Sequence, residues 1–423
     1  MRKMKDSGFD WIGEIPVTWQ IKRIKNIGQA RNGLTYTPND VCDPSEGTLV
    51  LRSSNIKDGK ISLSDCVYVS CAIPSKLKVK EGDILICSRN GSRELVGKSA
   101  LIGNIDASYG AFMMVFRCRN PKYMFYVLNS NIFSYYLGSF STSTINQLTG
   151  ADFGNMRIAY CPDMTEQKKI ADFLDEKCGE IDSIKADVQR QIELLNDYKK
   201  SVITEAVTKG LNPKAKLKDS GIEWIGKIPD HWKVEKFKYH LNFSGLRNPG
   251  NVEVLSLYRE LGIVPKNSRT DNFNQTSEDT SNYRYVRIGD FVINKMKAWQ
   301  GSVAVSDYNG IVSPAYFVYS FSDEVFFKRY FHYLLRNKTY ATEFKRLSGG
   351  IRVGQWDLPR EALENILVPI PPVSEQKEIA DYLDEKCSEI DAIIADKQKQ
   401  LETLDEFKKS LIFEYVTGKK EII

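Results

Sequence analysis

The chain has 423 residues, of which 42% are hydrophobic and 27% are charged, a composition that suits two or three globular domains with real cores. It contains no apolar run long enough for a membrane span, and its first residues lack the apolar core of a signal peptide. Eight cysteines without a C-x-x-C pair and three histidines argue against a zinc site, so we expect a cytoplasmic protein with no metal and no cofactor of its own.

A repeated phrase opens each half of the chain. Residues 5–19 read KDSGFDWIGEIPVTW and residues 218–232 read KDSGIEWIGKIPDHW, with ten of fifteen positions identical. Two Trp, a Pro and two Gly in fixed places indicate an internal repeat rather than a low-complexity tract. The Trp residues of the phrase cannot encode a difference between the halves, so we expect them to pack in the core or between domain and helix. They are Trp11, Trp19, Trp224 and Trp232.

Two dissimilar blocks share a skeleton. EGDILICSRNGSRELVGKSALIG (81–103) parallels IGDFVINKMKAWQGSVAVSD (288–307), because in both a Gly-Asp precedes a short apolar strand, a polar loop, a Gly and another strand. We predict two mixed α/β domains, over residues 1–160 and 211–370. Further strands are expected at 109–118 and 312–320, and helical stretches at roughly 121–138 and 323–347.

A second phrase follows each block. EQKKIADFLDEKCGEID (166–182) and EQKEIADYLDEKCSEID (375–391) agree at 14 of 17 positions. Apolar residues at heptad spacing predict a long helix over 165–210 and another over 374–420. Thr165 and Ser374 are candidate N-caps, and Gly210 and Gly418 suit the far ends.

A narrow apolar stripe needs a partner, and the nearest one is its own copy. We therefore expect the two helices to pack as an antiparallel coiled coil with pseudo-twofold symmetry, giving an α+β protein with two mixed domains in tandem repeat. Two separate helices, each docked on its own domain, are the alternative. The residues expected in the seam are Leu174, Ile181, Ile184, Val188, Leu195, Leu383, Ile390, Ile393, Leu404 and Leu411.

Positive charge is concentrated outside the helices. The segments 166–210 and 375–420 together carry 16 basic and 22 acidic residues, so the rest of the chain carries a net charge of +11, and 19 of the 20 Arg lie there. Arg is well suited to phosphates and guanine edges. The distribution fits domains that meet nucleic acid, although globular domains that simply use more Arg than helices do would also produce it.

Both phrases resemble those of the specificity subunit of type I restriction–modification systems. DSGxxWIGxIPxxW is similar to the entry to a target-recognition domain of that family, and PPVSEQKEIADYLD (371–384) is similar to the junction with its conserved helix. The resemblance covers the whole chain in order. The first junction departs from it, because Pro162 stands alone where Pro371 and Pro372 stand in the second.

The resemblance implies a non-catalytic subunit for phage defence. Each recognition domain would read one half of a bipartite, asymmetric site in double-stranded DNA, and the helices would set the gap between the halves. Two methyltransferase subunits would dock on the helices and methylate adenine, and restriction (motor) subunits would complete the complex. S-adenosylmethionine, ATP and Mg would bind to those partner subunits rather than to this chain.

Candidate base and phosphate contacts follow from side-chain chemistry. Polar and basic residues on loops between strands are the expected DNA readers, and no catalytic motif occurs in the sequence. In the first domain the candidates are Arg52, Ser53, Asn55, Arg89, Asn90, Ser92, Arg93, Lys98, Thr142 and Asn146. In the second domain they are Tyr258, Arg259, Lys295, Lys297, Trp299, Gln300, Arg352 and Gln355.

Two other hypotheses stay open at this point. The chain could serve a methylation-only system without a nuclease partner, which the sequence alone does not separate from full restriction. It could also be a coiled-coil scaffold between two protein-binding domains, which would show no salt-dependent affinity for duplex DNA.

Overall fold

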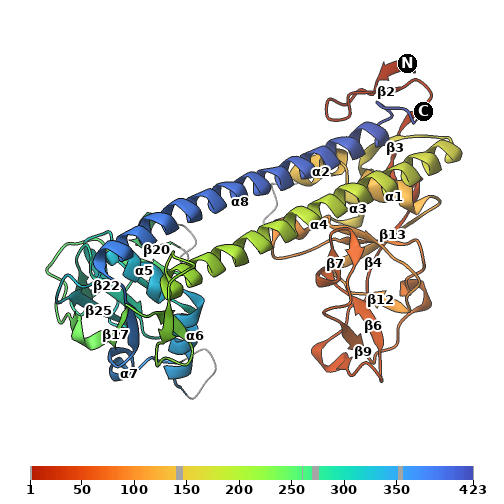
Figure 1. The fold of residues 1–423 in the computed structure, drawn as a ribbon. Coiled ribbons are helices and arrows are strands. Elements are labelled where there is room, and N and C mark those ends of the chain that lie inside the picture. The colour runs from red at the N-terminus through yellow and green to blue at the C-terminus, as the bar shows by residue number, and fades with distance from the viewer. Residues whose placement is uncertain (1, 140–145, 260, 269–275, 351–355, 423) are drawn as a thin grey trace. The chain divides into compact units, whose positions relative to one another are not determined.

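The computed structural model describes residues 2–139, 146–259, 261–268, 276–350 and 356–422 (Figure 1). The chain divides into two compact units, one of residues 1–189 with 398–423 and the other of residues 190–397. Each unit therefore combines one mixed domain with part of both long helices, α4 (Met164–Lys209) and α8 (Val373–Val416).

The domain of the first unit is built on a four-stranded antiparallel sheet. Its strand order is β11-β10-β13-β4, and a second sheet has the order β12-β6-β9-β5. The strands are β1 (Met4–Asp6), β2 (Glu14–Pro16), β3 (Gln20–Arg23), β4 (Gly28–Asn32), β5 (Val41–Cys42), β6 (Thr48–Leu51), β7 (Ile56–Lys57), β8 (Lys60–Ile61), β9 (Val67–Val69), β10 (Ile84–Cys87), β11 (Ser99–Leu101), β12 (Ala107–Tyr109), β13 (Met113–Cys118) and β14 (Arg157–Tyr160). The helices are α1 (Pro121–Leu128), α2 (Asn131–Ser139) and α3 (Gly150–Asn155).

The domain of the second unit is built on an equivalent four-stranded sheet. Its four-stranded sheet has the order β18-β25-β22-β23, which matches β4-β13-β10-β11 of the first. The strands are β15 (Leu217–Asp219), β16 (Lys227–Pro229), β17 (Lys233–Lys236), β18 (Leu241–Phe243), β19 (Leu255–Tyr258), β20 (Gly262–Pro265), β21 (Arg284–Val286), β22 (Phe291–Asn294), β23 (Val303–Val305), β24 (Gly310–Val312), β25 (Tyr316–Phe321) and β26 (Leu367–Ile370). The helices are α5 (Lys328–Arg336), α6 (Lys338–Leu347) and α7 (Arg360–Glu364).

The predicted α+β class and tandem repeat are confirmed, and the two long helices run antiparallel within each unit. In the first unit Lys408 of α8 reaches Asp182 of α4 at 2.5 Å. In the second unit Lys199 of α4 reaches Asp391 of α8 at 2.6 Å. The two ion pairs are equivalent in the repeat, with the roles of α4 and α8 exchanged.

The seam of the coiled coil contains lysines as well as apolar side chains. Leu174, Ile181, Val188, Leu383, Ile390 and Leu411 are buried, and Leu195 and Leu404 are partly buried. Lys185, Lys199 and Lys408 occupy a positions of the heptads, and Lys397 occupies a d position. Lys185 pairs with Asp405 and Lys397 with Gln191. Polar residues at such positions specify the register of paired helices, so these contacts select one alignment.

Two seam assignments and both N-caps are corrected by the structure. Ile184 is 49% exposed and Ile393 is 45% exposed, because both occupy g positions beside the seam rather than a or d positions. The first cap is Asp163, which precedes α4 and accepts a hydrogen bond from the Thr165 amide at 2.8 Å. Ser374 lies inside α8, whose first residue is Val373.

The repeated phrase packs each domain against both helices. Trp19 is fully buried and its Nε1 donates to Glu166, at the start of α4, at 3.4 Å. Gly418 follows the end of α8 with a φ of +71°, and a Cβ there would lie 2.5 Å from Pro16. The phrase therefore holds the start of one helix and the end of the other in the first unit.

The same junction is built in the second unit. Trp232 is fully buried and donates to Glu375, at the start of α8, at 3.1 Å. Gly210 follows the end of α4 with a φ of +71°, and a Cβ there would lie 3.3 Å from Trp232. The phrase recurs because each unit needs this contact once.

The second phrase supplies another repeated contact. Asp175 of α4 accepts hydrogen bonds from Tyr126 and Lys122, both at 2.7 Å. Its equivalent, Asp384 of α8, accepts from Tyr333 and Arg329, both at 2.6 Å. Partial burial of the Asp384 carboxylate opposes its ionisation, but the hydrogen bonds from Arg329 and Tyr333 hold its pKa below the usual value.

Candidate nucleic-acid interface

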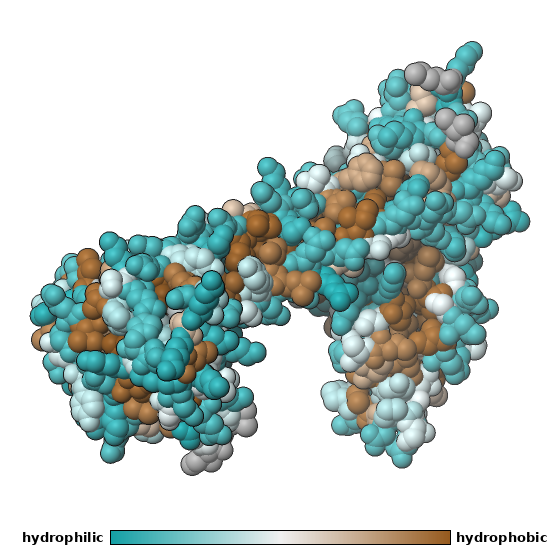
Figure 2. Space-filling model, viewed as in Figure 1, coloured by the Kyte–Doolittle hydropathy of each residue, from teal (hydrophilic) through white to brown (hydrophobic). Residues whose placement is uncertain are grey.

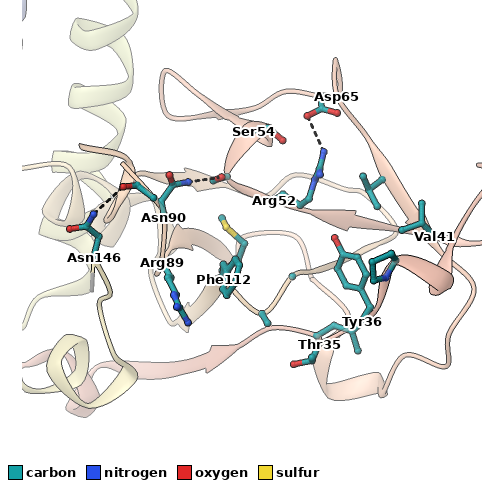
Figure 3. Close-up of a pocket in the computed structure, with 18 residues that line it drawn as sticks. Thr35, Tyr36, Val41, Arg52, Ser54, Asp65, Arg89, Asn90, Phe112 and Asn146 are labelled. Carbon is teal, nitrogen blue, oxygen red and sulfur yellow. Dashed lines mark hydrogen bonds and ion pairs between the residues drawn. The ribbon is translucent and has the colours of Figure 1, made fainter. Parts of the chain in front are cut away.

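A large open cavity of about 1150 Å³ lies in the first domain (Figure 3). Loops at the ends of β4, β6, β10 and β12 form its walls. Five residues that the sequence singled out line it together: Arg52, Ser53, Arg89, Asn90 and Asn146. The sequence had placed these residues on three separate loops, and folding brings them to one surface.

One side of the cavity holds a charged pair. Arg52 Nη2 donates to Asp65 Oδ2 at 2.9 Å, and about a third or more of each side chain stays exposed. Arg52 Nε is buried without a hydrogen-bond partner among the described residues. Asp65 fixes the direction of the guanidinium, and the exposed part of the side chain can donate, which is the arrangement that a planar, forked donor needs to meet a base edge or a phosphate.

The other side of the cavity is an amide and aromatic surface. Asn90 Nδ2 donates to Ser53 Oγ at 3.1 Å, and Asn146 Nδ2 donates to the Gly91 carbonyl at 3.1 Å. The Arg89 guanidinium lies 5.1 Å from the centre of the Phe112 ring, and Phe112 is 58% exposed. An exposed ring beneath a guanidinium offers a stacking surface together with positive charge.

The remaining candidates of the first domain fall outside the cavity lining. Ser92, Arg93 and Lys98 are exposed but do not line it, and Arg93 donates to the Gly138 carbonyl at 3.3 Å. Thr142 lies outside the described residues.

Asn55 is a correction to the sequence interpretation. It is fully buried, and its Nδ2 donates to the carbonyls of Ser62 and Asp65 at 2.9 and 2.8 Å. Its Oδ1 accepts from the Arg52 amide at 2.8 Å. All of its polar atoms serve this turn, so Asn55 positions Arg52 and Asp65 and is not available to DNA.

The equivalent loop of the second domain has a different chemistry. It follows β22, just as the Arg89 loop follows β10, and it carries Lys295, Lys297, Trp299 and Gln300. Lys295 Nζ lies 2.8 Å from Asp357. Trp299 packs edge-on against Trp356, with ring centres 5.5 Å apart, and the neighbouring Met296 is exposed. This surface pairs a lysine with a carboxylate beside two Trp rings.

The last candidates are less closely joined to that loop. Arg259 is exposed and its carbonyl accepts from Arg336, while Tyr258 before it is partly buried. Lys297 is exposed and Gln300 is half-buried. Arg352 and Gln355 lie outside the described residues.

Sequence reasoning missed Phe112, Tyr36, Asp65, Trp356 and Asp357. Phe112 stood in an apolar run that was assigned to a strand, but it precedes β13 and points outwards. The sequence candidates included no acidic residue, so Asp65 and Asp357 were not among them. Asp65 could have been found from its position, because it is an acidic residue about a dozen residues after the candidate Arg52.

Neither surface contains an activated nucleophile among the groups whose ionisation is perturbed. Burial raises the pKa of the Cys87 thiol beside the first cavity, and burial raises the pKa of Tyr316 beside the second loop. Both groups therefore stay neutral near pH 7. In the part of the chain that the structure describes, no cluster of His, Cys, Asp and Glu could hold a metal ion, and no helix is long and apolar enough to cross a membrane.

Comparisons with known proteins decide the family. The model of the "Type I restriction modification DNA specificity domain" matches residues 16–194 and 241–403, most of the chain. The chain belongs to this family of type I specificity proteins. It is a specificity subunit of a type I restriction–modification system, and its role is DNA sequence recognition.

Relatives of this type I family match along much of their length. The chain is 28% identical over 432 aligned residues to the putative type I restriction enzyme MjaX specificity subunit of Methanocaldococcus jannaschii, covering 96% of this chain and 95% of the relative. It is 25% identical to the EcoKI specificity subunit of Escherichia coli, covering 70% and 63%.

Solved structures share the fold. One, described as the structural basis of complex assembly and conformational transition of the type I R-M system, matches with a TM-score of 0.69 at 15% identity, covering 96% of this chain and 99% of that chain. The HsdS subunit from Thermoanaerobacter tengcongensis matches with a TM-score of 0.50 at 16% identity, covering 96% and 98%.

Proposed function

We propose that each recognition domain reads one half of a bipartite, asymmetric site in duplex DNA. The observation that carries this is that the two domains share the same backbone contacts around a loop but carry different side chains on it. Leu148 N bonds to the Ser88 carbonyl at 2.7 Å in one domain, and Leu358 N bonds to the Lys295 carbonyl at 3.0 Å in the other. The side chains presented there differ, namely Arg89, Asn90 and Phe112 against Lys295, Trp299 and Trp356. Different donors on one frame suit two different base sequences.

The long helices would set the gap between the two half-sites. Helices α4 and α8 have 46 and 44 residues, and each residue adds 1.5 Å. The seam lysines support this role, because the helices can define a fixed distance only if they pair in a single register. A slip by one heptad would remove the contacts of Lys185, Lys199 and Lys408 with their aspartates.

The chain would also recruit two adenine-N6 methyltransferase subunits through a surface that occurs twice. Ile184 and Phe407 precede seam lysines at g positions in the first unit, and Ile393 and Tyr198 occupy the equivalent heptad positions in the second. All four are 45–57% exposed. Figure 2 shows apolar side chains among hydrophilic ones along the surface of the helices. Because g positions face each other in an antiparallel pair, each unit presents one Ile beside one aromatic ring.

Substitutions of this surface test recruitment and its stoichiometry. Ile184→Asp with Phe407→Asp should remove one methyltransferase subunit from the purified complex, measured by native mass spectrometry, and the matching pair Ile393→Asp with Tyr198→Asp should remove the other. Leu194→Asp is the matched control, since Leu194 is 60% exposed at a c position, away from the seam. Full occupancy in both pair variants would refute this docking surface.

Catalysis would belong to the partners rather than to this chain. The methyltransferase subunits would hold S-adenosylmethionine, and the restriction subunits would hold ATP and Mg. The two candidate DNA surfaces support this division, because they offer hydrogen-bond donors and rings but the perturbed groups beside them, Cys87 and Tyr316, are held neutral.

A genome-wide map of methylated adenine tests the proposed function. The host would carry this chain with its methyltransferase, and the control would lack this chain alone. A split, asymmetric motif that disappears in the control is the expected result. A map that the deletion leaves unchanged would favour the scaffold hypothesis.

A further inference from the structure

Two arginines of the second domain lie against one phenylalanine ring, outside the loop described above, and a third arginine pairs with one of them. Arg284 and Arg360 place their guanidinium groups 5.0 and 4.8 Å from the centre of the Phe243 ring. Arg247 pairs with Arg284 through an isolated antiparallel β-bridge. Arg247 and Arg360 are exposed and Arg284 is half-buried. None of the three was a candidate from the sequence. We call Arg247, Arg284 and Arg360 the arginine cluster.

Internal partners leave most of this charge unbalanced. Glu364 lies 3.3 Å from Arg360 and also accepts from the Tyr319 hydroxyl at 3.3 Å, and it is the carboxylate that pairs with the cluster in the described part of the chain. Arg247 Nη1 donates to Asn282 Oδ1 at 2.8 Å, which is a neutral partner. Three guanidinium groups with one carboxylate leave a local charge of about +2.

Arg284 is the most constrained member. Its Nε is buried and has no hydrogen-bond partner among the described residues. Burial first, and then the neighbouring charges of Arg247 and Arg360, lower the pKa of Arg284. A buried donor without an acceptor is costly in a folded protein. An anion held by the exposed guanidinium groups of Arg247 and Arg360 would reduce the repulsion around Arg284.

The first domain lacks this feature at the equivalent place. Phe243 pairs with Tyr319 across β18 and β25, and Ala30 pairs with Phe116 across β4 and β13. Arg360 begins α7, where Gly150 begins α3. The smaller residues leave a cavity of about 290 Å³ between these elements. The shared fold therefore does not require the cluster.

We propose that the arginine cluster binds phosphate groups of the DNA backbone for the second recognition domain. Guanidinium groups match phosphate oxygens in pairs, and backbone contacts position a domain without reading sequence. The inference rests on the proposed function, because it assigns the phosphates to the duplex that this domain reads. An acidic surface of a partner protein is the competing ligand, and the experiment separates the two.

The test uses the full chain in complex with its methyltransferase subunits. Affinity is measured by fluorescence anisotropy between 0.1 and 0.5 M salt for two 40-base-pair duplexes, one with the methylated motif and one with a scrambled motif. The variants are Arg247→Gln, Arg284→Gln, Arg360→Gln and the triple variant. Lys338→Gln is the matched control, because Lys338 is exposed in the same domain but interacts with Asp197 of α4.

Each single variant should weaken binding to both duplexes alike, by about fivefold at 0.15 M salt, and should lower the slope of log affinity against log salt by about 0.9. The triple variant should weaken binding by about 100-fold, the control should stay within twofold of the parent, and the methylated motif should not change. If the triple variant unfolds, Arg247→Gln decides the matter, because its side chain is exposed and its hydrogen bonds are to Asn282.

Three results bear on the inference in different ways. An unchanged affinity and salt slope in the variants, beside normal binding by the parent, would overturn the phosphate site and leave the proposed function intact. Loss of methyltransferase from the triple variant without a change in slope would overturn it in favour of an acidic protein surface. Absence of salt-dependent DNA binding by the parent complex would refute the proposed function itself.

Discussion

Replacing Arg89 by Ala should separate DNA recognition from general surface charge in the first domain. Arg89 lines the large cavity and lies over the exposed Phe112 ring, so its guanidinium is held in place before DNA arrives. A well-placed bidentate contact to a base discriminates by about 1–3 kcal/mol, which corresponds to a loss of about 5- to 150-fold in affinity. Arg89→Lys should recover little of this, because an ammonium lacks the planar fork.

Arg93 provides the control for that prediction. It is exposed four residues further along the same loop, outside the cavity lining, and donates to the Gly138 carbonyl. Arg93→Ala should cost less than threefold in affinity, about the effect of removing one nearby charge. The assay is competition binding by the complex with methyltransferase, using duplexes changed in one half-site at a time. Equal losses for Arg89 and Arg93, or a loss for Arg89 with no relaxation in either half-site, would refute the reasoning.

Three further predictions concern the helices and the second domain. Inserting one heptad after Gln189 and one after Lys397 adds about 10.5 Å to each helix. The gap between the half-sites of the methylated motif should therefore grow by about three base pairs. An unchanged gap would contradict the proposal that the helices set it. A double-mutant cycle on Lys199 and Asp391, 2.6 Å apart and partly exposed, should give a coupling of about 0.5 kcal/mol in urea unfolding, and no coupling would argue against this register. Burial, Arg336 and Arg329 lower the pKa of His332 to about 3, below its unfolded value near 6.5. The stability from neutral His332 is therefore complete above pH 6.5 and is lost as pH falls towards 3, by about 3 kcal/mol at pH 4. His332→Gln should make the free energy of unfolding less dependent on pH. Identical pH profiles for the variant and the parent would contradict this role of His332.

The organisation of the chain could be predicted from sequence because the repeats report on it directly. Trp19 and Trp232 recur because each closes the same junction with a glutamate at the start of one helix and a glycine after the other. Asp175 and Asp384 recur because each fixes a recognition domain to its helix through a tyrosine hydroxyl. A contact that each unit forms once appears twice in the sequence, so the repeats can be recognised, and the heptad spacing of apolar residues then predicts the helices.

The details that failed depend on tertiary neighbours. Ile184 has the spacing of a seam residue, but Lys185 takes the a position and sends its ammonium to Asp405, which leaves Ile184 at the edge. Asn55 has the chemistry of a base reader, but the turn uses all of its polar atoms. Phe112 belongs to an apolar run, and its exposure follows from where β13 begins. In each case the local sequence is compatible with both a buried and an exposed side chain, and contacts with residues distant in sequence determine which one occurs.

The arginine cluster shows a different limit of sequence reasoning. Arg247, Arg284 and Arg360 are spread over more than a hundred residues, and none stands in a motif. The β-bridge places Arg247 beside Arg284, and the start of α7 places Arg360 on the same Phe243 ring as Arg284. The sequence offers no signal for such a site, because its members come together only through sheet topology.

Duplication of one recognition domain tests the central claim most directly. Residues 5–163 would be replaced by residues 218–372, so that the second domain occurs twice. The junctions allow this exchange, because Trp232 can meet Glu166 as it meets Glu375, and Arg329 and Tyr333 can meet Asp175 as they meet Asp384. The account predicts a methylated motif whose two halves are both the half read by the second domain. An unchanged asymmetric motif, from a complex that still methylates DNA, would contradict the claim that each domain reads its own half-site.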